Sequence, residues 1–378
     1  MKQLAISLAL AMTAGLAPGF YQGGPNKEST ETVAKPRRST NKDGQPAAPE
    51  AEQPKIPSKF GKKEGAIPEG PSFRSDVNTV NLDVAVVDNK GNFIPRIPKE
   101  AFRVLEDGTP QTVSAFGVGE GPMTVTMVIE FSNLYQRYWT ETWYQTLTAA
   151  YGFLETLKPE DYVAVVAYDL RPEILSDFST NKQKAYEAMQ RLRIPAFSES
   201  NLFDALVDTA ERMNEIEGRK AIVLLSTGVD TFSKLTFDKT RKALQNAGVP
   251  IYGIGLMQTY RELLDAYGYM GPIARLDFLQ ADNQMRTFAK ETGGMSFFPR
   301  FYGEFPSIFR NISDSLRNQY TMTYNPTNQT RDGKFRKIKV ELVNPGTGEP
   351  LRVVDQKGKP IKYTIIAKQG YTAPREVE

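Results

Sequence analysis

The fold of this chain is decided by the stretch Met127-Val128-Ile129-Glu130-Phe131-Ser132-Asn133-Leu134. A short continuous apolar run of this kind is typical of a strand buried in a parallel sheet. In open α/β sheets, ligands bind beyond the carboxyl ends of such strands, where Glu130 and Ser132 fall. Carboxylate and hydroxyl oxygens are hard ligands that suit ions such as Mg²⁺ and Ca²⁺. The stretch therefore predicts an α/β sheet with an oxygen-lined binding site at one edge.

Composition excludes several classes of protein. The chain has 378 residues, of which 40% are hydrophobic, so it can bury a large core and is long enough for more than one domain. It contains no cysteine and no histidine, which excludes disulfides, thiolate zinc sites, Ser-His-Asp triads and nearly all catalytic zinc sites. Any metal must be held by oxygen. A net charge of +3 without a basic stripe does not indicate nucleic-acid binding.

The first 72 residues are predicted to form two segments outside the folded domains, a signal peptide and a linker. Residues 1–21 have the pattern of a signal peptide, because Lys2 precedes the apolar residues 4–17, a run too short to span a bilayer comfortably. The alternative is an apolar first element of a cytosolic fold. Residues 22–72 are rich in Pro, Gly, Lys, Glu and Ser and predict a disordered linker. We therefore expect an exported protein (periplasmic, outer-surface or extracellular) without a transmembrane helix after signal cleavage.

Both flanks of the ordered part show strand patterns separated by turn residues. In residues 73–120 and 319–378 we predict strands at 80–86, 102–106, 112–116, 319–324, 336–342, 351–354 and 361–367. Neither flank has enough strands for a stable sandwich of its own. We therefore expect the two flanks to form one β-sandwich into which residues 121–318 are inserted.

The middle of the chain alternates strand and helix patterns, which indicates a mostly parallel sheet with helices on both faces. The predicted strands are 124–131, 162–168, 220–226, 249–257 and 295–298. The predicted helices are 140–157, 182–192, 202–217, 238–247, 284–291 and 305–316. Residues 258–282 are unusually long for a connection, which indicates either a functional loop or a short extra helix.

Three loops of this middle part resemble the metal-ion-dependent adhesion site of a von Willebrand factor type A (VWA) domain. The first loop of that family reads Asp-x-Ser-x-Ser; here Glu130 replaces Asp, Ser132 is present and Leu134 replaces the last Ser. In the second loop Ser200 takes the place of the metal-contacting Thr, and in the third Thr227 takes that of an Asp. The flanks resemble those of secreted VWA-related proteins abundant in Acidobacteria, through the motifs that start at Val80, Phe102, Asp332 and Gly370.

The resemblance implies one divalent cation (Mg²⁺, Ca²⁺ or Mn²⁺) held by Glu130, Ser132, Ser200 and Thr227. Two departures weaken such a site, because Leu134 removes a hydroxyl and Thr227 removes a charge, and affinity falls with fewer charged ligands. A metal-free site therefore stays open as an alternative. In that case Glu130 and Ser132 would cap the following helix or bond to loop amides.

Aromatic residues follow the first loop and are candidates for contact with a partner. Tyr and Trp dominate the energetics of protein interfaces, so we assign Tyr135, Tyr138 and Trp139 to partner binding. Trp143 lies one helical turn after Trp139 and is assigned to packing.

We expect a non-enzymatic, adhesion-type binding protein that recognises a protein or cell-surface ligand through the top face of the VWA domain. No catalytic residue and no organic cofactor is predicted. A hydrolase with Ser132 or Ser226 as nucleophile would lack histidine, and no Ser-x-x-Lys pair falls on a strand–helix turn. The alternative function is a metal-independent structural subunit of a cell-envelope assembly. The identity of the partner and the oligomeric state are not specified by the sequence.

Overall fold

In the computed structural model the described residues are 79–375, without 119–120, 133–138, 193–196 and 355–357. They all belong to one unit, which spans residues 46–378. The predicted signal peptide and linker lie outside the described residues. None of the described helices is long and apolar enough to cross a membrane.

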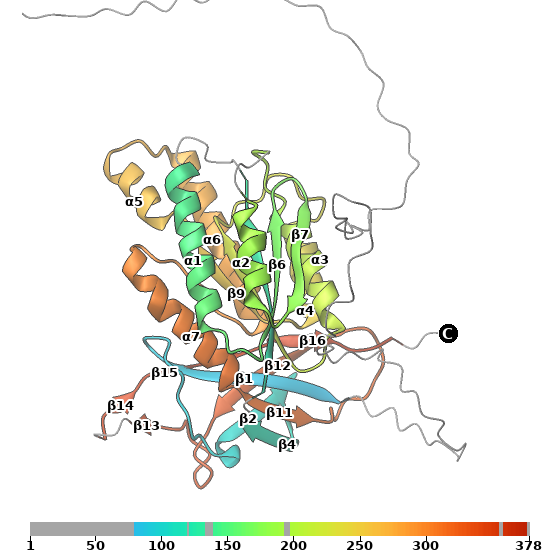
Figure 1. Ribbon diagram of the computed structural model, residues 1–378. Helices are drawn as coiled ribbons and strands as arrows, with labels where there is room; N and C mark the ends of the chain where they lie inside the picture. The colour runs from blue at the N-terminus through green and yellow to red at the C-terminus, as the bar shows by residue number, and fades with distance from the viewer. Residues whose placement is uncertain (1–78, 119–120, 133–138, 193–196, 355–357, 376–378) are drawn as a thin grey trace, which may run out of the picture. The chain divides into compact units, whose positions relative to one another are not determined.

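The middle of the chain forms a six-stranded sheet with the order β10-β9-β8-β5-β6-β7. Three of its strands, β6, β7 and β9, are labelled in Figure 1. Its strands are β5 (Met123–Glu130), β6 (Tyr162–Tyr168), β7 (Pro172–Ser179), β8 (Arg219–Ser226), β9 (Ile251–Gly255) and β10 (Ser296–Phe297). All neighbours pair in parallel except β7, which runs antiparallel to β6. Every residue of β5 is buried, as its apolar run predicts.

Helices cover both faces of this sheet. One face carries α1 (Trp139–Thr156), α2 (Lys182–Gln190) and α7 (Phe305–Arg317), and the other carries α3 (Leu202–Asn214), α4 (Phe237–Ala247) and α6 (Pro272–Thr292). Alternate residues of β5 enter opposite cores: Met127 and Ile129 pack with α1 and α7, whereas Val128 packs with α3. The strand therefore joins two apolar layers.

Local signals explain where several helices begin and end. Asn181 caps α2 by accepting a hydrogen bond from Gln183 N, and Thr236 caps α4 by accepting one from Lys239 N. Helix α4 ends at Gly248, whose φ of 62° is the left-handed conformation that favours glycine.

The structure differs from the sequence predictions in several elements, and the short strands at Thr109–Gln111 and Gly370–Thr372 of the flanks were also not predicted. Strand β7 was not predicted, since it is half exposed and begins with a proline at the edge of the sheet. The long connection contains the short helix α5 (Gln258–Ala266), and the helix predicted at 284–291 is the second half of α6, which already begins at Pro272. The first half of α6 is largely exposed, so it lacks the buried stripe that marks an amphipathic helix.

The two flanks form a sandwich of two four-stranded sheets, as the sequence predicts. Their orders are β15-β1-β11-β4 and β16-β12-β2-β3. The strands are β1 (Val80–Asp88), β2 (Phe102–Glu106), β3 (Thr109–Gln111), β4 (Val113–Val118), β11 (Tyr320–Tyr324), β12 (Phe335–Leu342), β15 (Tyr363–Ala367) and β16 (Gly370–Thr372). Each sheet contains strands from both flanks, and the two sheets share one apolar core. Smaller elements are η1 (Lys99–Ala101), η3 (Tyr302–Glu304), β13 (Val353–Val354) and β14 (Pro360–Ile361).

The insert leaves and rejoins the sandwich at neighbouring strands. Val118 at the end of β4 pairs with Tyr320 at the start of β11. Two further contacts tie the insert to the C-terminal flank: Gln319 Nε2 lies 3.3 Å from the Tyr252 hydroxyl, and Gln369 N donates to Glu291 O. The insert is therefore fixed to the sandwich by more than its two connections. The residue boundaries between the domains stay predictions.

Buried tyrosines make the stability sensitive to alkaline pH. Burial raises the pKa of Tyr252, which is fully buried, above its ordinary value of 10.0. Because the folded pKa exceeds the unfolded one, the stabilisation is complete below about pH 10 and is lost as the pH rises further. We expect Tyr252→Phe to flatten the decline above pH 10 by about 1.4 kcal/mol per pH unit. Urea denaturation between about pH 8 and pH 11 would measure this. Identical slopes above pH 10 would contradict it, and parallel curves below pH 9 serve as the control.

Candidate functional site

Polar side chains gather at the carboxyl edge of the sheet, where β5, β6 and β8 end side by side. The register pairs Glu130 with Tyr168 on β6, and Ile129 with Leu225 on β8. Glu130, Tyr168 and Ser226 are thus the last residues of three adjacent parallel strands. Since parallel strands end at the same edge, their side chains and the following loops converge on one point.

The Glu130 carboxylate is the centre of this cluster and is only 6% exposed. Oε1 accepts a hydrogen bond from Ser132 Oγ at 2.9 Å. Oε2 accepts one from Ser226 Oγ at 2.8 Å and one from the backbone amide of Thr227 at 2.7 Å. Thr227 Oγ1 lies 2.9 and 3.1 Å from the two carboxylate oxygens. Neutral donors therefore surround both oxygens of the buried carboxylate.

Tyr168 and Ser226 complete this hydrogen-bonded cluster, which we call the Glu130 network. Ser226 Oγ accepts from the Tyr168 hydroxyl at 2.8 Å and from Gly228 N at 2.8 Å, which leaves its own proton for Glu130. Burial, and next the charge of Glu130, raise the pKa of Tyr168 well above its ordinary value of 10.0. Tyr168 is therefore a permanent donor, and the network has a defined direction of hydrogen bonding.

Ser200 lies near this network and has spare bonding capacity. Its backbone binds the third loop, since Ser200 N donates to Thr231 Oγ1 at 2.8 Å and Ser200 O accepts from Thr231 N and Phe232 N. Its hydroxyl is completely buried and lies near the Tyr168 hydroxyl, whose pKa it lowers against the larger effect of burial, but it forms no hydrogen bond of ordinary geometry with a described residue. Asp230 does not bond to Glu130; it accepts from Phe203 N at the start of α3, and burial raises its pKa.

The predicted metal-site residues thus lie together only in part. Ser132 and Thr227 each bind Glu130, whereas Ser200 belongs to the adjoining loop and approaches the network at Tyr168. The positions of Leu134, Tyr135 and Tyr138 lie outside the described residues. Trp139 is the first residue of α1, and neither its side chain nor that of Trp143 is described. The roles of these aromatic residues in partner binding stay predictions.

The donor set fits a divalent ion poorly as it is arranged. Such an ion takes about six oxygen ligands and binds more tightly when more of them are charged. Glu130 supplies the one carboxylate of the described network, and the Thr227 amide that occupies Oε2 cannot rotate away as a hydroxyl can. In the part of the chain that the structure describes, no group of three or more acidic residues could hold a metal ion. In this arrangement both oxygens of Glu130 accept hydrogen bonds from protein donors.

A buried arginine adds positive charge at the same loop. Arg261 of α5 is 5% exposed and donates from Nη2 to Thr227 O at 2.7 Å. Its Nη1 pairs with Asp282 at 2.6 Å, and the guanidinium lies 4.2 Å from the centre of the Phe278 ring. Gly228 packs against α6 so closely that a Cβ there would lie 2.7 Å from Met285 Sδ. The long connection therefore holds the third loop in place.

Sequence reasoning missed Tyr168 and Arg261. Tyr168 could have been found, because it ends a predicted strand of the same parallel sheet, and polar residues at the carboxyl ends of such strands face the same edge. Arg261 has no such signal, since it lies on a helix that was one of two alternatives for residues 258–282.

Removing the Thr227 hydroxyl tests whether the Glu130 network contributes to stability. We expect Thr227→Val to lower the free energy of unfolding by about 1–3 kcal/mol, because a buried carboxylate loses a donor. Urea denaturation would measure the change. Ser114→Ala is a control, because Ser114 is exposed and its hydroxyl bonds only to Thr323 O. Equal stabilities of wild type and Thr227→Val would show that the network is not formed in solution.

An open, mostly parallel sheet with a polar cluster at its carboxyl edge defines a ligand-binding α/β domain. Residues 136–303 match the sequence model of the von Willebrand factor type A domain, so this part of the chain is a VWA domain. The predicted fold, a VWA domain inserted into a β-sandwich, is confirmed. No curated protein matches the chain in sequence.

Solved structures with similar folds include several VWA proteins. A von Willebrand factor type A protein from Catenulispora acidiphila is 12% identical with a TM-score of 0.38, over 80% of this chain and 76% of that one. The VWF domain of the type V pili tip protein Mfa5 from Porphyromonas gingivalis is 13% identical with a TM-score of 0.39, over 52% and 95%. Proximal thread matrix protein 1 from the mussel byssus is 13% identical with a TM-score of 0.40, over 56% and 51%. The chain thus spans about half the length of that byssus protein.

Proposed function

We propose that this chain is an exported, non-enzymatic binding protein of the adhesion type. It recognises a protein or cell-surface ligand through the carboxyl edge of the VWA sheet, that is, the ends of β5, β6 and β8 with the loops that follow them. The VWA fold supports a binding role, because such domains generally serve as interaction modules. The signal-like pattern of residues 1–21 supports export.

The observation that carries the proposal is the Glu130 network. Four donors hold the carboxylate that would otherwise anchor an ion, and Arg261 places a positive charge on the neighbouring carbonyl. We therefore propose that the edge works without a divalent cation. The network gives the loops a fixed shape, which favours recognition because less freedom is lost on binding.

The same geometry does not support hydrolysis by a serine. Ser226 is completely buried and donates its proton to Glu130, so it cannot reach a substrate. Ser132 also donates to Glu130, and the chain has no histidine to act as its base.

A second candidate function is a structural subunit of a cell-envelope assembly. It is favoured by exposed apolar side chains on α5, on α6 and between them: Leu263, Tyr267, Tyr269, Ile273, Leu276 and Leu279 are each 49–78% exposed. Apolar residues gathered in this way often mark a protein interface. In such an assembly the VWA domain would be a fixed contact and would need no ion.

Site-specific photo-crosslinking in the native cell tests the binding proposal. Phe232 follows the third loop and is 56% exposed, whereas Val354 of the sandwich is 54% exposed. We expect a photoreactive phenylalanine analogue at position 232 to give discrete adducts that EDTA does not abolish, and the analogue at 354 to give none. Adducts at both positions, or at 354 alone, would contradict binding through the carboxyl edge. Adducts lost in EDTA would contradict metal independence.

A further inference from the structure

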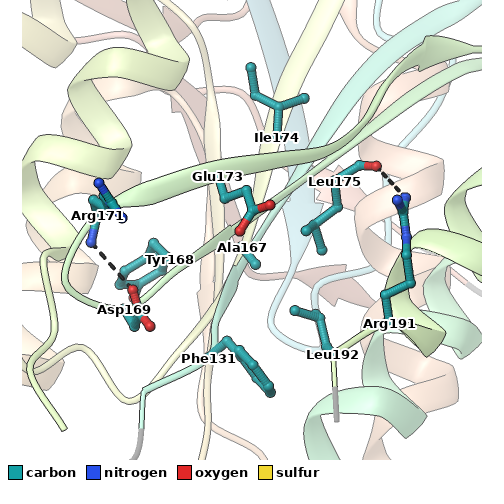
Figure 2. A pocket seen from close by; sticks show the side chains of 10 residues that line it. All are labelled: Phe131, Ala167, Tyr168, Asp169, Arg171, Glu173, Ile174, Leu175, Arg191 and Leu192. Atoms are coloured by element: carbon teal, nitrogen blue, oxygen red, sulfur yellow. Dashed lines mark hydrogen bonds between the residues drawn. The ribbon is translucent and has the colours of Figure 1, made fainter. Parts of the chain in front are cut away.

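A pocket of about 310 Å³ lies beside the Glu130 network, between β6, β7 and the end of α2 (Figure 2). It shares Tyr168 with the network and includes Phe131, which follows Glu130 directly. Its lining residues are Phe131, Ala167, Tyr168, Asp169, Arg171, Glu173, Ile174, Leu175, Arg191 and Leu192. This volume is at the lower end of the about 300–1,000 Å³ of small-molecule pockets, which is room for a single extended side chain.

The pocket has an apolar side and, apart from it, two carboxylates. Phe131, Leu175 and Leu192 form an apolar side, and Figure 2 shows the Glu173 carboxylate in the space between them and Tyr168. Asp169 adds a second carboxylate at the end of β6. An aliphatic stem could therefore lie against the apolar side while its head group meets two acids.

Neither carboxylate forms an ion pair among the described residues. Asp169 accepts a long hydrogen bond from Arg171 N at 3.4 Å, and nearby backbone amides and the charge of Arg171 act on its carboxylate, but among the described residues neither Asp169 nor Glu173 forms an ion pair with a guanidinium. Burial raises the pKa of Asp169, which means that its charge lacks part of its hydration. A bound cation would compensate the Asp169 carboxylate for the hydration that it has lost.

The two arginines of the pocket neutralise these acids only in part, since burial raises the pKa of Asp169 more than the charge of Arg171 lowers it. Arg191 turns outward and donates from Nη2 to Leu175 O at 2.7 Å, and Figure 2 shows Arg171 directed away from the centre. Both arginines and Glu173 are exposed, whereas Asp169 is half-buried. The half-buried charge of the pocket is thus that of Asp169, which disfavours an acidic occupant next to it.

We propose that this pocket binds a lysine side chain of the protein ligand, with the ammonium group between Asp169 and Glu173 and the four-carbon stem against Leu175, Leu192 and Phe131. A lysine ammonium is a compact point charge that can approach two separate carboxylates, whereas arginine favours a planar pairing with one. The inference rests on the proposed function, since it names the chemistry recognised next to the Glu130 network.

Saturation-transfer NMR on the full chain tests the pocket with small probes and needs no known partner. The probes are N-acetyl-lysine-N-methylamide and the corresponding norleucine, arginine and glutamate amides. We expect the lysine amide to bind at least tenfold more tightly than the norleucine amide, which has the same stem without the charge. Equal affinity for lysine and norleucine, or tighter binding of arginine or glutamate, would overturn the proposal.

Variants locate the binding. Glu173→Gln and Asp169→Asn, which keep the shape of each side chain, should each weaken lysine binding about tenfold. Glu187→Gln is the matched control, because Glu187 is exposed on α2 and does not line the pocket. An unchanged melting temperature would show that each variant is folded. Unchanged lysine affinity in the folded double variant Asp169→Asn/Glu173→Gln would place the probe elsewhere and overturn the assignment.

The two proposals fail in different ways. Adducts from position 232 together with no preference for the lysine amide would refute the lysine pocket and leave the proposal of binding at the carboxyl edge intact. The opposite outcome is crosslinks from position 354 alone, together with lysine binding that depends on Asp169 and Glu173. That outcome would refute the proposed function and leave the pocket as a lysine site.

Discussion

Replacing Asp161 with alanine is expected to lower the free energy of unfolding by about 3–5 kcal/mol, because it breaks a buried ion pair and leaves one charge alone. Asp161 is completely buried before β6 and pairs with Arg317 at 2.6 Å. It also accepts from Met123 N at 3.0 Å and from Lys158 N at 2.7 Å. One carboxylate therefore holds the start of β5, the turn before β6 and the end of α7.

Urea denaturation of Asp161→Ala measures this effect. Asp314→Ala is the control, since Asp314 is exposed on the same helix as Arg317 and should change stability by less than about 0.5 kcal/mol. The double variant Asp161→Asn/Arg317→Met should recover part of the loss, because neither charge is left buried. A loss below about 1 kcal/mol in Asp161→Ala would show that the pair contributes little.

The second large effect concerns Thr227→Asp, alone and with Leu134→Ser. Thr227 Oγ1 lies within 3.1 Å of both oxygens of Glu130, so an aspartate there brings two carboxylates together. Two like charges in one buried site are unfavourable unless a proton or a cation lies between them. We expect stability in EDTA to fall by about 1–3 kcal/mol through the lost donor alone. We expect the double variant to bind Mg²⁺, Ca²⁺ or Mn²⁺ at least tenfold more tightly than wild type, about 1.4 kcal/mol.

Calorimetric titration and thermal unfolding, each with and without the ion, measure both parts of this prediction. An ion at 1,000 times its dissociation constant should restore about 4 kcal/mol, because it binds the folded state. Thr227→Asn is the control of similar shape without the charge, and its stability should not respond to the ion. Equally weak binding by wild type and the double variant would show that the three loops do not surround an ion. Tight binding by wild type would contradict the metal-free network.

Much of the fold could be predicted because its strongest signals are local. The apolar run of β5 and the alternation in β1 follow directly from how strands are buried. The pairing of the two flanks followed from counting strands, since each flank alone is too small to be stable. Strand β7 was missed because an edge strand is half exposed and begins with Pro172, which is usually a turn residue.

The candidate site was predictable at the strand ends and much less so elsewhere. Glu130 and Thr227 were identified from loop patterns, and their contact follows from the adjacency of β5 and β8. The hydrogen bonds that both Glu130 oxygens accept were not predictable, because they depend on side-chain distances of tenths of an ångström. Arg261 reaches the site from a helix that is distant in the sequence, and only tertiary packing places it there.

The pairing of β4 with β11 also determines how the molecule would respond to a pulling force. The chain enters the VWA domain from one of these strands and leaves it into the other, and Val118 and Tyr320 pair directly. Tension applied at residues 79 and 375 would act on the sandwich first, because the pairing of β4 with β11 holds the two ends of the insert together. The sandwich strands would have to separate before the VWA sheet carried any tension, so the ligand-binding edge would keep its shape while the sandwich was stretched.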